Sequence, residues 1–170
     1  MPNDGSLPIK GVLLHDTLWL RPDADRRREW EVALRELAEE AGMSIREATG
    51  LEGTATLKLA MVYDAVELRA QVGEEVRVAA RMALETIRAQ VQEYLAIVER
   101  MGKALSEGTT HRLEALDLAK AIVHDDAATK IQRVLKPGLD LDFPAARRFF
   151  TLLCILVRDG APKTQETTET

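Results

Sequence analysis

The sequence predicts an α+β fold in which a small antiparallel sheet of three or four strands packs against about five helices. Two patterns predict it: apolar and polar residues alternate between residues 57 and 82, and apolar residues recur at three- and four-residue spacing elsewhere. The chain has 170 residues, of which 46% are hydrophobic and one is a cysteine. That length is sufficient to form a core without disulfides or a structural metal.

The first elements are a strand and a helix. The apolar stretch from Ile9 to Leu20 has β-branched and aromatic members, which indicates a strand at the sheet edge, or a fourth strand. The Pro-Asp pair that follows indicates the start of a helix. The apolar stripe of this helix begins at Trp30, and Gly42 is positioned to end the helix. Residues 44–53 contain two glycines and little periodicity, so we expect a loop or a short helical turn there.

The alternating segments predict a β-hairpin and a third strand. Folding the chain at Asp64-Ala65 pairs Tyr63 with Val66 and places the apolar residues of both strands on one face. A further alternation up to Met82 predicts the third strand. Residues 74–84 could instead be helical, because Ala, Met, Leu, Arg and Glu dominate there; we favour the strand.

Helical periodicity dominates the rest of the chain. One helix runs from Glu85 to Gly108, and Thr109 or Thr110 can cap the next helix, which buries either Ile122 or Val123. The His-Asp-Asp sequence at 124–126 interrupts the pattern and predicts a helix-helix junction. A further helix stops at Lys136-Pro137-Gly138. The last helix starts at Asp142 and is apolar from Phe149 to Val157 at every position except Thr151, which indicates a central core helix.

The domain boundary and the compartment follow from composition. We expect residues 1–158 to form a single domain and residues 159–170, which are polar, rich in threonine and without periodicity, to form a flexible tail. The amino terminus lacks the basic start and the cleavage site of a secretory signal, and Cys154 has no partner for an intrachain disulfide. Both observations predict a cytoplasmic protein.

Charge and composition exclude several function classes. No apolar run approaches the roughly 20 residues needed to cross a bilayer, so we expect no membrane partner. The formal charge of −5 and the low aromatic content of 4% argue against a dedicated nucleic-acid binder. An association with RNA through the basic triplet 26–28, Arg77 and Arg81 is a weaker hypothesis.

The second half of the chain contains segments in a recognisable order and spacing, namely Leu113 to Asp117, Ala119, Ile122, His124, Ala128, Gln132, Leu135 and Ala145 to Cys154. These segments resemble an uncharacterised protein family found mainly in alphaproteobacteria. The resemblance covers residues 56 to 157, with looser agreement in the first helix. The sequence departs from the family at Asp125-Asp126-Ala127, where the family more often has an amide, an acid and a glycine. The resemblance implies a strand-strand-strand-helix order and a bacterial cytosolic setting, and it implies no activity.

Four polar residues inside this region are site candidates. His124 beside Asp125 suits a general base, with Asp117 as a second candidate, but we favour helix capping by His124 and the aspartates because no nucleophile motif accompanies them. Arg147 and Arg148 can bind an anionic ligand, although an intramolecular salt bridge to Asp117, Asp126 or Asp142 is the commoner outcome. We expect Cys154 to be an unreactive, buried thiol.

We therefore expect a non-enzymatic interaction or regulatory protein that forms a homodimer or binds a protein partner. We expect no cofactor and no metal, since no P-loop, dinucleotide fingerprint, nucleophile elbow or zinc spacing is present. The alternative is a small enzyme or an anionic-ligand-binding protein with a site between the last three helices. That alternative requires Asp117, His124 and Arg147 to converge on one cavity that solvent can reach.

Overall fold

The computed structural model describes residues 5–20, 22–39, 42–46, 48 and 50–160, which form an α+β fold with four α-helices. The strands are β1 Leu7–Leu14, β2 Met43–Ile45, β3 Ala55–Val62, β4 Ala65–Val72, β5 Glu75–Ala83 and β6 Leu139–Leu141. The α-helices are α1 Ala24–Glu39, α2 Arg88–Glu107, α3 Thr110–Leu135 and α4 Phe143–Arg158, and the 3₁₀ helices are η1 Asp16–Leu20 and η2 Leu84–Ile87. The predicted tail lies outside the described residues from 161 onward.

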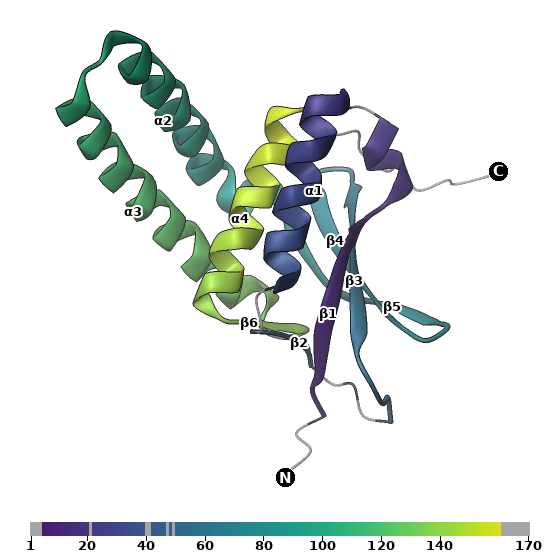
Figure 1. Ribbon diagram of the computed structural model, residues 1–170. Coiled ribbons are helices and arrows are strands. Elements are labelled where there is room, and N and C mark those ends of the chain that lie inside the picture. The colour runs from purple at the N-terminus through teal and green to yellow at the C-terminus, as the bar shows by residue number, and fades with distance from the viewer. Residues whose placement is uncertain (1–4, 21, 40–41, 47, 49, 161–170) are drawn as a thin grey trace.

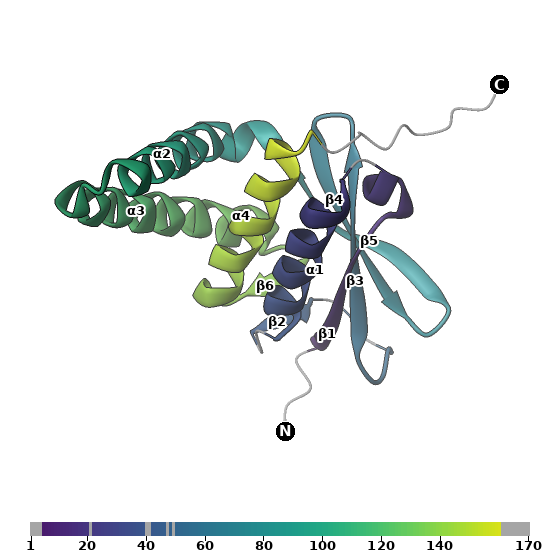
Figure 2. The same ribbon diagram turned by 45° about the horizontal axis from the view of Figure 1, so that its top comes forward.

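The strands form one curled, mixed sheet of six strands in the order β5-β4-β3-β1-β2-β6. β1 runs parallel to β3, and the other neighbours are antiparallel. In Figures 1 and 2 the α-helices lie to one side of this sheet, with α1 and α4 side by side against it. The predicted α+β class is confirmed. The expected antiparallel sheet of three or four strands with about five helices is wrong, because the described chain has six strands, four α-helices and a parallel pair that local patterns do not reveal.

The predicted hairpin exists with a register two residues away from the expected one. Val62 pairs with Ala65 and Met61 with Val66, so Tyr63 and Asp64 form the turn. A two-residue shift keeps the strand residues on their faces, so the expected apolar face is preserved except at Tyr63, which is 58% exposed. Tyr63 adopts a left-handed backbone conformation in this turn, with φ 55°. The third strand is also confirmed, because residues 75–83 are β5 rather than helix.

The first apolar stretch divides into two elements. The strand ends at Leu14, and the chain continues as η1, which brings Trp19 within 5.6 Å of Trp30, measured between ring centroids. The Asp23 carboxylate accepts a hydrogen bond from the Arg26 backbone N–H and caps α1, as its position predicted. The expectation that this stretch is one strand up to Leu20 is therefore wrong.

The predicted helix-helix junction at residues 124–126 is also wrong. α3 is continuous over 26 residues, and Val123, His124 and Ala127 are buried inside it. Helix capping by His124 is excluded with the junction. The sequence left open whether Ile122 or Val123 is the buried residue. Val123 is buried, with 4% of its surface exposed, whereas Ile122 is 61% exposed.

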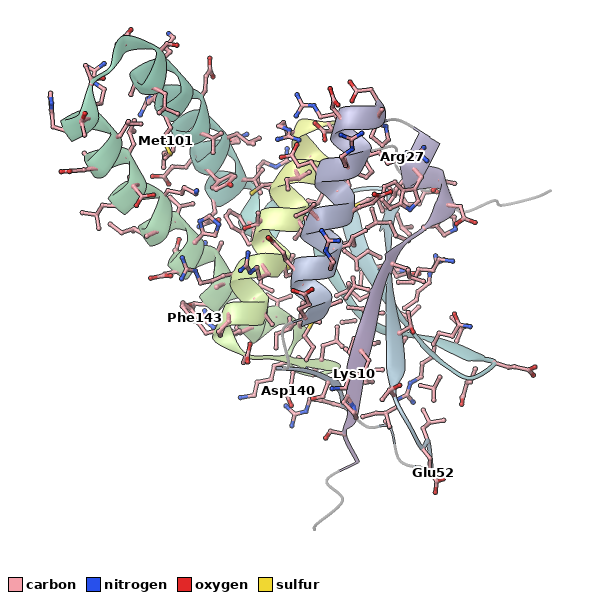
Figure 3. All side chains as sticks on the ribbon, in the orientation of Figure 1. Lys10, Arg27, Glu52, Met101, Asp140 and Phe143 are labelled. Carbon is pink, nitrogen blue, oxygen red and sulfur yellow. The ribbon has the colours of Figure 1, made fainter. Side chains whose placement is uncertain are left out.

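The two longest helices form a projecting arm. α2 and α3 run antiparallel, joined at Gly108, whose φ of 68° ends α2 as predicted. The end of the arm that carries this turn lies away from the sheet in both views, and Figure 3 places Met101 in the outer half of α2. We call this pair of helices the arm.

The last helix is the core element that the sequence predicted. α4 buries Phe149, Phe150 and Cys154 among nine buried residues, and burial raises the pKa of the Cys154 thiol. Asp142 caps its first turn by accepting a hydrogen bond from the Ala145 N–H. At the other end Trp30 Nε1 donates to Asp159 at 2.6 Å, which ties α4 to α1.

Two short strands, β2 and β6, fall where the sequence predicted no strand. Each has three residues, and they pair with each other in the register Met43 to Leu141 and Ile45 to Leu139. Gly138, just before β6, closely approaches β5, because a Cβ atom built on it would lie 1.8 Å from the Ala79 carbonyl oxygen. Gly42 also has a close neighbour, because a Cβ atom built on it would lie 1.8 Å from Asp142 Oδ2. The expected end of the first helix at Gly42 involves residues 40 and 41, which lie outside the described residues.

None of the helices in the described part of the chain is both long enough and apolar enough to span a bilayer.

Candidate functional site

All four candidate residues line one cavity where the arm meets α4. The cavity has a volume of about 360 Å³, and His124, Asp117 and Arg147 all contribute to its wall. Arg148, the fourth candidate, lines it as well. A second cavity of about 350 Å³ shares His124, Arg147, Arg148 and Thr151 and extends toward Pro144. We call the two together the α3–α4 cavity; its remaining wall is formed by Tyr94, Lys120 and Ala121.

His124 lies at the base of this cavity and is held by two hydrogen bonds. Its Nδ1 atom is 3.0 Å from the Lys120 carbonyl oxygen, and its Nε2 atom is 2.9 Å from Thr151 Oγ1. Tyr94 and Phe150 pack edge-on against the ring, with centroids 5.0 and 5.4 Å away. Burial lowers the pKa of His124, and the positive charges of Arg147 and Lys120 lower it further against the opposing effects of the Lys120 carbonyl and Asp125.

The tautomer of the neutral ring follows from these partners. A backbone carbonyl only accepts hydrogen bonds, so Nδ1 carries the hydrogen that points to Lys120. Nε2 then has a lone pair that faces Thr151 Oγ1 at 2.9 Å. The Arg147 carbonyl oxygen, at 3.2 Å, is the other acceptor within reach of the Thr151 hydroxyl. The site therefore contains a hydroxyl within hydrogen-bond distance of an imidazole lone pair.

The two arginines have acidic partners on the surface of the molecule. Arg147 Nε lies 3.5 Å from Asp125, and Arg148 Nη1 lies 2.9 Å from Glu36 on α1. All four side chains are between 43% and 55% exposed, so both ion pairs are weak. Salt bridges of these arginines within the chain were expected, but neither residue pairs with Asp117, Asp126 or Asp142 in these contacts. Asp142 caps α4, and Asp126 accepts a hydrogen bond from Gln90.

Lys120, Thr151 and Tyr94 belong to the site, although the sequence did not single them out as site residues. Lys120 precedes His124 by four residues and Thr151 follows Arg147 by four, so each pair shares one helix face. Thr151 was also the only polar position in the apolar stretch of α4. This polar exception was the feature of the sequence that could have indicated Thr151 as a site residue. Nothing local indicates Tyr94, since only the packing of α2 on α3 brings it to the cavity.

Three of the five basic residues considered for RNA make contacts within the chain. Arg27 donates to the Trp19 carbonyl and lies over the indole ring, and Arg26 pairs with Asp159. Arg81 forms an ion pair with the buried Glu67. No group of three or more His, Cys, Asp or Glu side chains suited to a metal occurs in the described ranges.

Comparison with known proteins identifies relatives along most of the chain. The model of an uncharacterised protein family, UPF0262, matches residues 8–158. A UPF0262 protein of Maricaulis maris is 32% identical over 140 residues, covering 82% of this chain and 86% of the relative. A UPF0262 protein of Erythrobacter litoralis is 33% identical over 153 residues, covering 87% and 94%. No solved structure matches.

The relatives are alphaproteobacterial proteins, as the resemblance in the second half of the chain predicted, and the match extends through the first strand and helix. The chain therefore belongs to the uncharacterised family UPF0262.

Proposed function

We propose that this protein binds a small anionic ligand, a carboxylate or a phosphate, in the α3–α4 cavity. The observation that carries the proposal is the charge of the cavity wall, where Lys120, Arg147 and Arg148 stand against a single carboxylate, Asp117. Arginine side chains bind carboxylates and phosphates with paired N–H donors. Anionic-ligand binding was the alternative function considered from the sequence, and it required Asp117, His124 and Arg147 to line one cavity. Their common position in the α3–α4 cavity supports the proposal.

An incoming anion can replace the surface ion pairs of the two arginines at low cost. Exposed pairs of this kind contribute about 0–1 kcal/mol, whereas hydrogen bonds between an arginine and a carboxylate inside a concave site contribute about 1.5–3 kcal/mol. The buried ring of His124 and the Tyr94 side chain form an apolar wall beside the cations, which reduces the dielectric screening of the bound charge.

Isothermal titration calorimetry with succinate and with inorganic phosphate tests the proposal. We expect Arg148→Gln and Arg147→Gln each to weaken binding about tenfold, which corresponds to about 1.4 kcal/mol. Arg112→Gln is the matched control, because Arg112 also forms an exposed ion pair, with Glu107 at the end of the arm. No measurable binding of either anion, or an equal loss in the control, contradicts the proposal.

A second candidate function is homodimerisation; the sequence favoured a non-enzymatic interaction or regulatory protein that forms a homodimer, and the structure offers the arm as the surface for it. The face of α3 that does not contact α2 carries Leu118 and Ile122, which are 65% and 61% exposed. Ala115 extends this apolar row by one further turn, at a spacing that suits antiparallel helix pairing with a second copy. Size-exclusion chromatography with light scattering tests it: a dimer that Ile122→Lys dissociates is expected, and a monomer at every concentration contradicts it.

We also propose a cytoplasmic location. The single cysteine supports it, because Cys154 is free and buried in α4. Fractionation of cells that express the tagged chain, with a periplasmic and a cytoplasmic marker, is the corresponding measurement.

A further inference from the structure

We propose that the α3–α4 cavity is a hydrolase active site in which Thr151 is the nucleophile and His124 its general base, acting on a carboxylic ester that carries a negative charge. The recognition of that charge rests on the anion binding proposed above. The nucleophile and the base rest on separate observations, namely the hydrogen bonds around His124 and the position of Thr151 in the cavity wall.

A hydroxyl, an imidazole and a group that orients the imidazole are connected by hydrogen-bond distances in this cavity. Thr151 Oγ1 lies 2.9 Å from His124 Nε2, and the opposite ring nitrogen lies 3.0 Å from the Lys120 carbonyl oxygen. Nucleophilic hydroxyls of hydrolases are activated by an imidazole within about 2.6–3.2 Å whose far nitrogen is oriented by a third group. Here a backbone carbonyl of α3 takes the place of the usual carboxylate.

The ordinary role of a helical threonine does not account for this geometry. Thr151 Oγ1 is also 3.2 Å from the Arg147 carbonyl oxygen, the contact made by threonines that bond to the preceding turn. If the only hydroxyl hydrogen pointed there, lone pairs of Oγ1 and Nε2 would face each other across 2.9 Å. The neutral ring therefore takes the hydrogen from Thr151 and leaves Oγ1 a lone pair for the cavity.

His124 has the protonation state that a base requires. The titratable and charged groups around it are Tyr94 from α2, Lys120, Asp117 and Asp125 from α3, and Arg147 and Arg148 from α4. Burial and the nearby cations lower the pKa of His124, so the ring is neutral near pH 7 and ready to accept a proton. Once the ring is protonated, the Lys120 carbonyl holds the Nδ1–H and fixes the orientation of the ring.

The reaction proceeds through an acyl-enzyme. Thr151 Oγ1 attacks the ester carbonyl carbon while its proton moves to His124 Nε2, and the oxyanion that forms is stabilised by Arg147, one turn earlier on α4. The carbon–oxygen bond to the alcohol breaks, and the alcohol leaves with the proton from His124. Water then attacks the acyl group, gives a proton to His124, and the carboxylic acid departs as Thr151 recovers its hydrogen. Arg148 and Lys120 hold the substrate's own carboxylate.

The test is hydrolysis of p-nitrophenyl succinate, with the uncharged p-nitrophenyl acetate as the comparison substrate. We expect Thr151→Val, which keeps the shape of the side chain, to abolish turnover and Thr151→Ser to retain it. We expect His124→Gln to lower kcat by about 10²–10⁴, the usual contribution of a general base. Thr129→Val is the matched control, because Thr129 also bonds to the carbonyl four residues earlier, on an exposed part of α3 outside this cavity.

Mass spectrometry of quenched reactions provides a readout that a structural role of Thr151 would not produce. A succinyl group on the peptide that contains Thr151 is expected in the wild type and absent from Thr151→Val. Thermal unfolding of each variant by circular dichroism shows whether it folds, and Thr151→Ser keeps the test decisive if Thr151→Val does not. Hydrolysis no faster than in buffer, or equal in wild type and folded Thr151→Val, overturns the inference.

The two proposals fail in different ways. Succinate binding without ester hydrolysis contradicts the hydrolase and leaves the anion site intact. Hydrolysis of both esters at equal rates, without succinate binding, supports the nucleophile and contradicts the anion site. Absence of both binding and hydrolysis contradicts both.

Discussion

Single residues acquire their roles from neighbours that lie far away in the sequence. His124 is separated from Thr151 by 27 positions, yet the two side chains share a hydrogen bond because α3 packs on α4. In the sequence the aspartates next to His124 made it look like a helix end. In the structure Asp125 faces Arg147 instead, and the ring points inward between Tyr94 and Phe150.

Glu36 is predicted to compete with the ligand for Arg148. Its carboxylate lies 2.9 Å from the guanidinium, and both side chains are nearly half exposed. Glu36→Gln removes one competitor of the anion for Arg148, an exposed pair worth up to about 1 kcal/mol, so it is expected to tighten succinate binding about two- to fivefold. Calorimetry measures it, with Glu107→Gln at the arm end as control. Weaker binding by Glu36→Gln would mean that the pair holds Arg148 in its binding position.

His124 is predicted to make stability depend on pH. Its pKa in the folded protein is lowered below the ordinary value of 6.5, so the folded state favours the neutral ring. The corresponding stability is complete above pH 6.5 and is lost as the pH falls through the lower pKa of the folded state. Urea unfolding between about pH 5 and 8 should show this fall in the wild type and a smaller one in His124→Gln. Equal slopes for both proteins exclude His124 as the cause.

At the scale of elements, packing overrides local preference in α3. Aspartate inside a helix costs less than about 1 kcal/mol relative to alanine, and two of them do not outweigh a continuous buried stripe. Val123 and Ala127 are buried on either side of the predicted junction, and Gln90 of α2 donates a hydrogen bond to Asp126 at 2.8 Å. The strands were easier to predict, because their alternation is a local property that also determines which face is buried.

Two glycines of the arm are predicted to respond in opposite directions to alanine. Gly102 lies inside α2 with no heavy atom within 4 Å of an added Cβ, so Gly102→Ala should stabilise the protein by about 0.5–1 kcal/mol. Gly108 has φ 68°, where a side chain is strained, and Gly108→Ala should cost about 1–2 kcal/mol. Urea unfolding of the two variants is the measurement. The same sign for both changes would show that α2 does not end at Gly108.

At the scale of the whole molecule, the curl of the sheet brings its two ends together. β5 and β6 are the first and last strands of the order, yet the residue before β6 touches β5 at Ala79. This closure also places the carboxyl end of α3 against the sheet, so that the arm projects from a fixed base and α4 crosses beside it (Figure 2).

Gly138→Ala is predicted to disturb this closure. The added Cβ would lie 1.8 Å from the Ala79 carbonyl oxygen, and backbone on one side or the other must move. Overpacking of this kind costs about 1–3 kcal/mol, so a lower midpoint of thermal unfolding is expected. Gly102→Ala serves as the control for a glycine without a close neighbour. An unchanged midpoint for Gly138→Ala would show that the contact with β5 is not required for stability.

Local residue patterns were enough to predict the α+β class, three of the strands, the core helix α4 and the family, because periodicity and caps are encoded by residues close together along the chain. The parallel pairing of β1 with β3, the two short strands and the unbroken α3 could not be predicted in this way, since they depend on contacts between distant segments. The site was divided in the same way. Residue type and position singled out Asp117, His124, Arg147 and Arg148. The packing of α2, α3 and α4 brought them together and added Thr151, whose hydroxyl gains its partner only where α4 meets α3.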